Sequence, residues 1–402
     1  MTAANPTLKL KRLQDLDVRG KRVLARVDYN VPMKDGKVTD DTRIRETLKT
    51  LEYLLSQDAK VVLVAHLGRP KGKPEPKYSL RPVAEALAKL LKRPVAFASD
   101  CIGPEADQVV AGLKPGGVAL LENLRFHAEE EKNDPAFAAA LAKHGDVFVQ
   151  DAFGAIHRAH ASTVGVCKHL SGGIGFLVQK ELEFLDRVVN NPTRPFLAII
   201  GGAKVSDKLG VLDKLLDKVD GLLIGGGMAY TFLSGQNVSI GKSLLEADQV
   251  GEAKKIVQKA YAKKVNCLLP ADHVVVKEIK PDAPTVVTQS MAVPPDMIGV
   301  DIGPHTIELF TEDIKKAKTI FWNGPMGIFE TEAFAKGTLE VAKAMAAATK
   351  KGATTIVGGG DSLAALAKAG VAAQISHCST GGGASLELLE GKVLPGLAAL
   401  AG

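Results

Sequence analysis

The chain has 402 residues, 46% hydrophobic and 24% charged, which indicates a globular protein with more than one core rather than a disordered one. Its net charge of +6 is small for this length and no dense run of Lys and Arg is present, so the charge favours a small anionic ligand over nucleic acid. The sequence contains neither an apolar stretch of membrane-spanning length nor the apolar region of a secretory signal, which predicts a cytoplasmic protein without membrane contact.

Taken in chain order, the first half of the sequence alternates short β-branched runs with segments of helical spacing. Apolar residues recur at helical intervals over 43–57 and 79–92, which predicts two helices. The runs that we expect to form strands are 22–27, 61–65, 118–121 and 147–150.

A Gly-rich turn, a long helical pattern and Asn-Asn-Pro follow within residues 171–192. We interpret this stretch as a helix near 178–190 that joins two domains. We therefore expect a first domain over 1–175 and a second over 176–389. An ordinary crossover helix inside a single domain is the alternative.

The second half repeats the alternation of strands and helices, with a further helix expected over 336–350. Its expected strands are 196–200, 221–226, 266–270, 319–322 and 354–357. The alternation predicts the α/β class, with two doubly wound, Rossmann-like parallel-sheet domains of about six strands each, joined by a hinge helix. One sheet of nine or more strands is the alternative.

Arginines and histidines follow the strands expected in the first half. Ligands of parallel sheets bind beyond the carboxyl ends of the strands, and the planar fork of Arg matches carboxylate and phosphate oxygens. Each arginine alone could be a surface ion pair, but four at successive strand ends indicate a small ligand with several negative charges. The residues at this edge are Asp28, Tyr29, Asn30, Arg43, His66, Leu67, Gly68, Arg69, Arg125, Asp151, His157, Arg158 and His160.

Glycine clusters follow the strands expected in the second half. Glycine lets backbone N–H groups approach an anion, and a helix N-terminus adds partial positive charge, so the pattern favours a polyphosphate. Asp361 is suited to Mg²⁺, which takes one or two carboxylates together with phosphate oxygens. One triple glycine alone would be a plain turn. The residues at this edge are Gly201, Gly202, Lys204, Lys208, Gly225, Gly226, Gly227, Asn323, Glu330, Gly358, Gly359, Gly360, Asp361, Ser362, Gly381, Gly382 and Gly383.

Lys204 and Lys208 are four residues apart. If this stretch opens a helix, both ammonium groups lie on one face near its N-terminus, where they could follow a phosphoryl group between ligands. Two solvated lysines are the alternative.

Other phosphate and redox motifs are missing. The nearest approach to a P-loop, at 235–243, has one residue too many between its glycines, and no G-x-G-x-x-G follows the first strand. The segment IHRAH lacks the Asp of a protein kinase catalytic loop. The cysteines lie far apart without a C-x-x-C pair, so we expect buried free thiols at Cys101, Cys167, Cys267 and Cys378.

The sequence closely resembles the phosphoglycerate kinase family over nearly its whole length. Ser362 stands where some members carry Thr, which keeps the hydroxyl. The stretches that carry the resemblance, in order, are RVDYNVP (26–32), HLGRPKG (66–72), LLENLRFH (120–127), DAFGAIHRAHAST (151–163), GGAKVSDKL (201–209), GGGMAYTF (225–232), IFWNGPMGIFE (320–330), GGGDS (358–362) and STGGGASLELLEG (379–391).

The resemblance implies reversible phosphoryl transfer from 1,3-bisphosphoglycerate to ADP, giving 3-phosphoglycerate and ATP with Mg²⁺ as cofactor. It also implies a monomer without nucleic-acid partner, and a C-terminal tail, 390–402, that packs back on the first domain. In the family the first edge binds the glycerate substrate, here through Asp28, Tyr29, Asn30, Arg43, His66, Leu67, Gly68, Arg69, Arg125 and Arg158.

By the same resemblance the second edge binds the nucleotide, with Glu330 on the ribose, Asp361 on Mg²⁺ and Gly303 near the adenine. Arg43, Lys204, Lys208 and the helix start at Gly381, Gly382 and Gly383 would meet the transferred group. The nucleotide-binding residues that it implies are Gly201, Gly202, Lys208, Gly225, Gly226, Gly303, Asn323, Glu330, Gly359, Gly360, Asp361 and Ser362.

The acceptor of the phosphoryl group is already an anion, so we expect no general base, and in-line positioning with charge stabilisation carries the reaction. Water would hydrolyse an acyl phosphate, which predicts closure of the two domains by a hinge near 171–192. A two-domain binding protein without chemistry and an NAD-dependent dehydrogenase are the competing classes.

Overall fold

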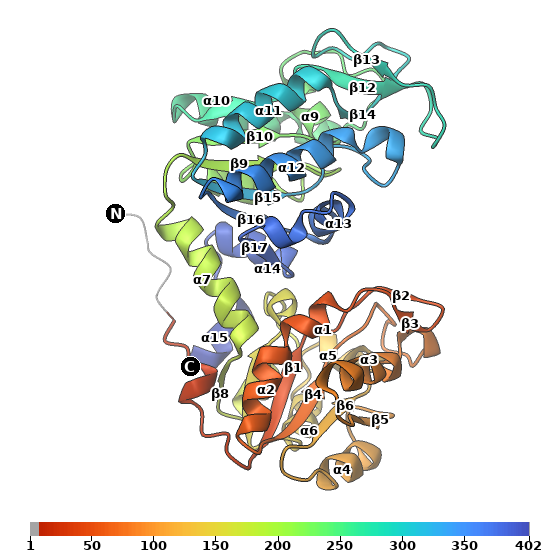
Figure 1. The fold of residues 1–402 in the computed structure, drawn as a ribbon, viewed down its shortest axis with the longest axis vertical. Helices are drawn as coiled ribbons and strands as arrows, with labels where there is room; N and C mark the ends of the chain where they lie inside the picture. Colours follow the sequence, from red (N-terminus) through yellow and green to blue (C-terminus); the bar gives the residue numbers. More distant parts are fainter. Residues whose placement is uncertain (1–7, 402) are drawn as a thin grey trace. The chain divides into compact units, whose positions relative to one another are not determined.

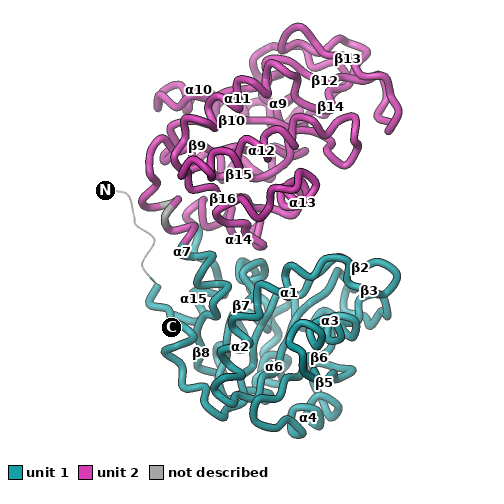
Figure 2. The backbone as a smooth tube through the Cα atoms, viewed as in Figure 1, with its two compact units in different colours: residues 1–183, 392–402 teal, residues 184–391 magenta. Residues whose placement is uncertain are grey.

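The computed structural model describes residues 8–401, and two compact units divide the chain (Figure 2). The first unit comprises residues 1–183 together with 392–402, and the second comprises residues 184–391. Each unit contains its own six-stranded parallel sheet, which confirms the predicted fold class (Figure 1).

The sheet of the first unit has the strand order β5-β6-β4-β1-β7-β8, and every neighbouring pair is parallel. The four expected strands lie within one residue of their predicted ends, whereas the short edge strands β5 and β8 were not predicted. In sheet order the strands are Ala96–Ala98, Val118–Leu121, Lys60–Val64, Arg22–Val27, Val147–Asp151 and Gly172–Ile174.

Helices cover both faces of this sheet because its central strands are apolar on both sides. In β1, Val23 and Ala25 belong to one core cluster and Leu24 to the other. Helices α1 (Thr42–Glu46), α2 (Leu48–Ser56) and α3 (Arg81–Leu91) pack on the first face. Helices α4 (Pro104–Ala111) and α6 (Pro135–Ala142) pack on the second. A short hairpin of β2 (Met33–Lys34) and β3 (Lys37–Val38) and the helix α5 (Ala128–Glu131) complete the loops.

The sheet of the second unit has the order β11-β10-β9-β15-β16-β17, which is the order 3-2-1-4-5-6 of a doubly wound fold. The chain reverses direction across the sheet between β9 and β15, so a ligand is expected beyond the carboxyl ends of these two strands. In sheet order the strands are Asn266–Leu268, Gly221–Ile224, Phe196–Ile200, Thr319–Asn323, Thr354–Gly358 and His377–Ser379.

The helices of the second unit also form two layers. Helices α8 (Leu209–Leu215), α9 (Ala229–Gly235), α10 (Val250–Ala262) and α14 (Gly382–Leu389) share one core cluster with the sheet. Helices α11 (Pro304–Lys316), α12 (Lys336–Lys350) and α13 (Gly360–Lys368) share the other. An antiparallel sheet that the sequence did not predict consists of β13 (Val286–Val287), β12 (His273–Val276) and β14 (Ile298–Ile302).

Helix α7, Phe176–Asn190, joins the two units. The division between the units falls at Glu183, inside this helix, whereas the sequence analysis placed the domain boundary before it. The C-terminal helix α15, Pro395–Ala401, belongs to the first unit, where the Gly396 N–H donates to the Ile156 carbonyl at 2.9 Å.

Two expectations about side chains and membranes can be compared with the described residues. All four cysteines are free, but only Cys101 is fully buried, and the other three are half-buried. Within residues 8–401, no helix is long and apolar enough to cross a membrane.

Asp151 ends β7 and caps the first turn of α7. Its Oδ1 accepts hydrogen bonds from the backbone N–H groups of Leu177 (2.9 Å) and Val178 (3.3 Å). The side chain is completely buried, and this burial raises the pKa of Asp151 from 3.8 to about 7, although its hydrogen bonds oppose the shift.

Because this pKa is raised in the folded state, the native chain holds a proton between pH 4 and 7 that the unfolded chain has lost. The contribution of Asp151 to stability is therefore largest near pH 4 and falls as the pH rises to 7. Asp151→Asn keeps the capping oxygen and removes the titrating charge. The free energy of unfolding of this variant should therefore decline less steeply with pH than that of the wild type, by up to about 1.4 kcal/mol per pH unit. Urea unfolding from pH 4.5 to 7.5 measures the difference, and parallel curves for the two proteins would contradict it.

Candidate functional site

The predicted anion-binding residues of the first unit lie at the carboxyl ends of β1, β4, β6 and β7. Asp28 follows β1 and its Oδ2 lies 2.9 Å from Nη1 of Arg43, which comes from the first turn of α1. The Asn30 Oδ1 accepts the Gly68 N–H at 2.8 Å, and Nη1 of Arg125 donates to the Gly68 carbonyl at 2.9 Å. Segments that are far apart in the sequence thus converge at one edge of the sheet.

The positive charges of four arginines act on His66, and we call these residues the arginine cluster: Arg26, Arg43, Arg125 and Arg158. His66 is buried, and its burial, followed by the charges of these arginines, holds its pKa well below the ordinary value of 6.5. The imidazole is therefore neutral at physiological pH. Nη2 of Arg26 lies 3.0 Å from its Nδ1, and because arginine only donates, Nδ1 accepts and Nε2 carries the proton.

The same positive field acts on His160. Burial, followed by the charges of Arg125, Arg26 and Arg158, lowers the pKa of His160 to about 4. The charges of Arg26, Arg125 and Arg158 thus act on both histidines. Excess positive charge with low solvent exposure stabilises an anionic ligand.

Arg26 is a member of this cluster that the sequence analysis missed. It lies inside β1, is only 1% exposed, and its Nε donates to Ser162 Oγ at 3.0 Å. Ser162 Oγ in turn donates to Glu130 Oε1 at 2.5 Å, so a buried carboxylate balances part of the charge. An arginine between the apolar residues Ala25 and Val27 of a buried strand was the signal available in the sequence.

Among the residues predicted at this edge, two have buried side chains and one lies outside the arginine cluster. The Tyr29 side chain is fully buried and its hydroxyl is 2.9 Å from Thr47 Oγ1, so it belongs to the core. Leu67 is also buried, and the Asn123 side chain binds both its N–H and its carbonyl. Arg69 is exposed and is absent from the arginines that act on His66.

A cavity of about 370 Å³ lies at Gly68, whose carbonyl accepts the hydrogen bond of Arg125, but none of the four arginines lines it. Asn30, Leu67 and Gly68 line it together with residues of the β2–β3 hairpin and of the segment 76–82. This cavity gives a small ligand space beside the predicted anion-binding residues.

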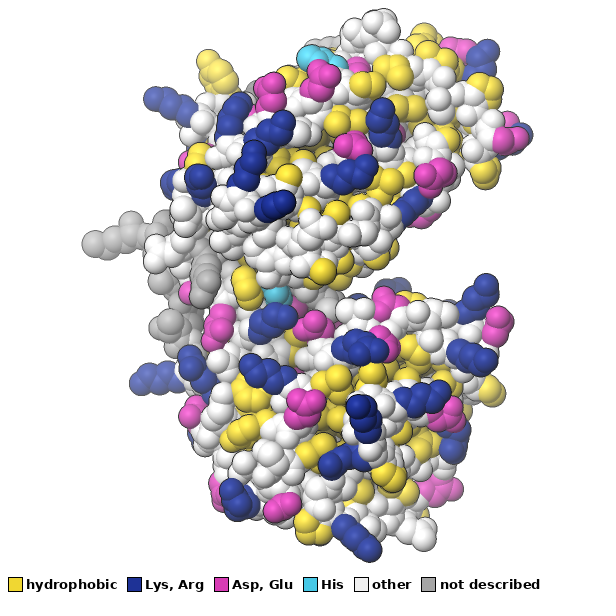
Figure 3. All heavy atoms as spheres, in the orientation of Figure 1, with side chains coloured by type: hydrophobic (Ala, Val, Ile, Leu, Met, Phe, Trp, Pro, Cys, Tyr) yellow, Lys and Arg dark blue, Asp and Glu magenta, His cyan; other side chains and the backbone are white. Residues whose placement is uncertain are grey.

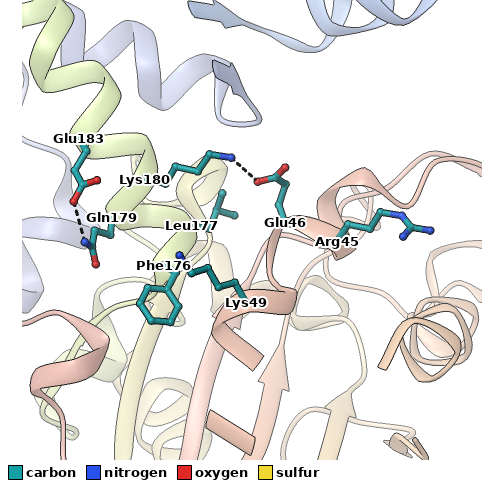
Figure 4. Close-up of a pocket in the computed structure, with 8 residues that line it drawn as sticks. All are labelled: Arg45, Glu46, Lys49, Phe176, Leu177, Gln179, Lys180 and Glu183. Atoms are coloured by element: carbon teal, nitrogen blue, oxygen red, sulfur yellow. Dashed lines mark hydrogen bonds and ion pairs between the residues drawn. The ribbon is translucent and has the colours of Figure 1, made fainter. Parts of the chain in front are cut away.

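A second hollow of about 350 Å³ lies between α1, α2 and the start of α7 (Figure 4). Lys180 Nζ lies 3.3 Å from Glu46 Oε2 in this hollow, and Arg45 is paired outside it with Asp41. It contains none of the predicted site residues. On the face shown in Figure 3, Lys and Arg are interspersed with Asp and Glu over both units, in agreement with the low net charge.

The predicted glycines of the second unit form a wall at the reversal point between β9 and β15. The Gly201 N–H donates to the Asn323 carbonyl at 2.9 Å, and the Gly202 N–H donates to the Pro325 carbonyl at 3.0 Å. A Cβ atom on Gly201 would collide with the Pro325 carbonyl oxygen, so only glycine permits this close approach. The Gly226 N–H completes the wall by donating to the Met326 carbonyl at 3.0 Å.

Leu244 was also missed by the sequence analysis. It is 48% exposed although it is large and apolar, and it lies against Gly227. An exposed leucine beside a glycine wall offers an apolar surface to a flat ring.

Asn323 connects the ends of three segments. Its Oδ1 accepts a hydrogen bond from Lys208 Nζ, and its Nδ2 donates to the Gly358 carbonyl at 2.8 Å. Burial lowers the pKa of Lys208, while the charges of Asp207 and Asp361 oppose the shift, so Asp361 lies near this ammonium group. Ser362 is buried, and its Oγ accepts the Gly324 N–H at 2.7 Å.

The starts of α13 and α14 meet at Gly359. Gly359 has φ +98°, which favours glycine, and it precedes the first turn of α13, which contains Asp361. A Cβ on Gly382, at the start of α14, would come 2.7 Å from the Gly359 Cα atom. Two helix N-termini therefore lie side by side, where an anion is favoured.

Residues 201–208 do not form the helix that would have placed Lys204 and Lys208 on one face. Residues 201–208 form a loop, Lys208 is the N-cap of α8, and Lys204 is exposed. The Glu246 carboxylate accepts the N–H groups of Val205 (2.5 Å) and Ser206 (3.1 Å), and these bonds hold the loop outside the helix.

Gly303 and Glu330, two further predicted residues, lie in different surroundings. Gly303 is the N-cap of α11 and its N–H donates to the Asp272 carbonyl at 2.9 Å. Glu330 is exposed at the end of the loop that follows β15.

The residues present at this edge fit a magnesium ion that takes most of its ligand atoms from a bound phosphate compound. Asp361 is an exposed carboxylate beside two helix N-termini, and Mg²⁺ commonly takes one or two carboxylates plus phosphate oxygens. Among residues 8–401, the one group of three donor side chains close enough to hold a metal by themselves lies elsewhere, at Asp100, Cys101 and His127.

Known proteins are similar to this chain over nearly its whole length. The family model for phosphoglycerate kinase matches residues 13–392. A phosphoglycerate kinase from Elusimicrobium minutum is 58% identical over 393 residues, which cover 98% of each chain. One from Moorella thermoacetica is 58% identical and covers 96% of this chain and 98% of its own.

Solved structures with the same description are also similar. Phosphoglycerate kinase from Coxiella burnetii has a TM-score of 0.85 with 43% identity, and the match covers 97% of this chain and 98% of that one. The enzyme from Pyrococcus horikoshii has a TM-score of 0.86 with 36% identity and the same coverage.

Proposed function

This chain belongs to the phosphoglycerate kinase family, and we propose that its two units divide the reaction of that family between them. The reaction is the reversible transfer of a phosphoryl group from 1,3-bisphosphoglycerate to ADP, which gives 3-phosphoglycerate and ATP. The observation that supports the division best is the arginine cluster around a neutral His66 in one unit, matched by a glycine wall in the other.

The arginine cluster binds the glycerate substrate in this proposal. Arg43, Arg125 and Arg158 carry its charge, and Asn30 and the neutral Nε2–H of His66 supply hydrogen bonds. Arg26 acts as a positioning residue because it fixes the tautomer of His66. Tyr29 and Leu67 contribute to this site only through their backbone, since their side chains are buried.

The glycine wall binds the nucleotide. The adenine lies against Gly201, Gly202 and Gly226 with Leu244 beside it, and Glu330 binds the ribose hydroxyls. Asn323, with Gly359, Gly360 and Ser362, supports the phosphates, and Asp361 would hold Mg²⁺. When bound, the ion neutralises phosphate charge.

Charge stabilisation carries the transfer step. Arg43 from the first unit, and Lys204, Lys208 and the α14 start at Gly382 from the second, bind the oxygens of the moving group. The acceptor is an anion in both directions, so no general base is assigned. We propose that substrate binding closes the two units over the reacting atoms, and that the chain acts as a cytoplasmic monomer.

A coupled assay tests the activity directly. The chain should consume 3-phosphoglycerate only when ATP and Mg²⁺ are both present. A two-domain binding protein would show no turnover, and a dehydrogenase would require a nicotinamide cofactor instead. Small-angle scattering tests closure, because the radius of gyration should fall only when both substrates are present.

Arg69→Ala should mainly weaken binding of 3-phosphoglycerate. Arg69 is exposed, directly follows Gly68 in the chain and is not among the arginines that act on His66, so in this proposal it adds charge for the ligand from outside the arginine cluster. We expect KM for 3-phosphoglycerate to rise about 10-fold, as for the loss of roughly 1.4 kcal/mol of binding, with kcat little changed. Lys73→Ala, an exposed neighbour, is the control. A large loss of kcat with unchanged KM would reverse this assignment.

A further inference from the structure

A second set of reactive side chains lies at the same edge of the first sheet, outside the arginine cluster. Asp100 and Cys101 follow the edge strand β5, and His127 follows the 3₁₀ turn Leu124–Phe126 at the end of β6. Neither the glycerate site nor the nucleotide site proposed above uses these three residues.

The donor atoms of the three residues converge. One carboxylate oxygen of Asp100, a ring nitrogen of His127 and Sγ of Cys101 all lie within 4.8 Å of one another. Asp100 Oδ1 and His127 Nε2 are already 2.7 Å apart. Asp100 Oδ1 also accepts the backbone N–H of Cys101 at 2.6 Å, which fixes the carboxylate at the start of the cluster.

The combination of these donors selects a class of metal. Thiolate sulfur and imidazole nitrogen suit Zn²⁺ and similar borderline-soft ions, whereas Mg²⁺ and Ca²⁺ require oxygen ligands. At bond lengths of about 2.0–2.3 Å, tetrahedral Zn²⁺ ligands lie roughly 3.3–3.6 Å apart. To reach these separations the three donor atoms must move by about 1 Å. The side chains of Asp100 and His127 are 43% and 26% exposed, so they can make this movement.

We propose that Asp100, Cys101 and His127 form a Zn²⁺-binding site with a fourth position open to water. The exposed side chains provide the route of entry, and the buried Cys101 closes the inner side of the site. This inference does not depend on the phosphoryl-transfer function proposed above.

The site would connect the loop after β5 to the segment after β6. His127 is the N-cap of α5, the helix that contains Glu130 and Glu131. Glu130 binds Ser162 below the arginine cluster, and Glu131 Oε1 lies 3.3 Å from Arg125 Nε. A bound ion would therefore fix the β5–α4 loop to the segment that supports Arg125.

Cobalt provides a spectroscopic test on the full, untagged chain, treated with chelator and free of nucleotide. Co²⁺ should bind at one equivalent and produce a near-ultraviolet thiolate-to-cobalt charge-transfer band that Zn²⁺ abolishes. Cys101→Ser should remove the band. Cys167→Ser, which changes another free cysteine of the same unit, should retain it.

His127→Gln provides a second variant at a half-buried position, in case Cys101→Ser does not fold. Its affinity for Co²⁺ should fall by more than the roughly 100-fold loss that a change outside the ligands can cause. Zn²⁺ should also raise the Tm of the unmodified chain and of Cys167→Ser but not that of His127→Gln. The absence of the charge-transfer band, its persistence in Cys101→Ser, or unchanged affinity in His127→Gln would overturn the proposal.

Discussion

Arg43→Ala is expected to lower kcat by about 10²-fold or more, with a smaller effect on KM for 3-phosphoglycerate. The reason is the position of the guanidinium group. Its Nη1 lies 2.9 Å from Oδ2 of Asp28, the residue that follows β1. The Arg43 side chain remains 30% exposed at the carboxyl edge of the sheet. A donor fixed before the reaction stabilises charge in the transition state without reorganisation, and its loss therefore acts on kcat.

The control for this prediction is two residues away. Arg45 comes from the same helix, but it is paired with Asp41 at 2.7 Å and its side chain is 58% exposed. Arg45→Ala should retain nearly full activity, because exposed ion pairs contribute little. Thermal unfolding of both variants separates catalysis from stability, since Arg43→Ala leaves the buried Asp28 without this partner. Near wild-type turnover in Arg43→Ala would remove Arg43 from the transfer step.

Conservative replacement sharpens the test. Arg43→Lys keeps the positive charge but loses the planar fork that matches phosphate oxygens. We expect its kcat to lie between those of the wild type and Arg43→Ala. Equal losses in the two variants would show that the geometry of the guanidinium group, rather than its charge, carries the effect.

The sequence predicted both large sheets because buried parallel strands are continuous apolar runs. The predicted and observed ends agree for the strands 22–27, 118–121 and 196–200, because a polar residue or a glycine directly follows each apolar run. The short edge strands β5 and β8 were missed because three residues give no periodicity to detect. The antiparallel sheet was also missed, although only β13 is as short as two residues, and β12 and β14 have four and five.

Local patterns could not reveal contacts between distant segments. The predicted helix 43–57 is interrupted at Thr47, whose hydroxyl donates to the Ile44 carbonyl at 2.8 Å and also meets Tyr29. Arg26 was read as part of a strand, and its role depends on His66 and Ser162, which lie 40 and 136 residues further along the chain. That the predicted residues of the first unit meet at one edge was nevertheless predictable, because parallel strands place their carboxyl ends together.

The loop 201–208 shows most clearly how a side chain can override a spacing rule. A helix through this segment would have placed Lys204 and Lys208 on one face. The Glu246 carboxylate instead binds the N–H groups of Val205 and Ser206, and a second oxygen accepts the Ser206 hydroxyl at 2.5 Å. The two lysines consequently differ, because Lys208 is half-buried on Asn323 whereas Lys204 is exposed.

This difference leads to the second large expected effect, for Lys204→Ala. An exposed ammonium group on a loop fixed by Glu246 can contact a phosphoryl group in transit without first leaving a protein partner. We expect kcat to fall about 10²-fold or more while KM for ATP changes little, because the contact forms mainly in the transition state. Lys214→Ala changes an equally exposed lysine on α8 and should retain wild-type kcat. If Lys204→Ala raised KM for ATP and left kcat intact, Lys204 would be a ground-state nucleotide ligand, and stabilisation of the moving group in the second unit would rest on Lys208 and the start of α14.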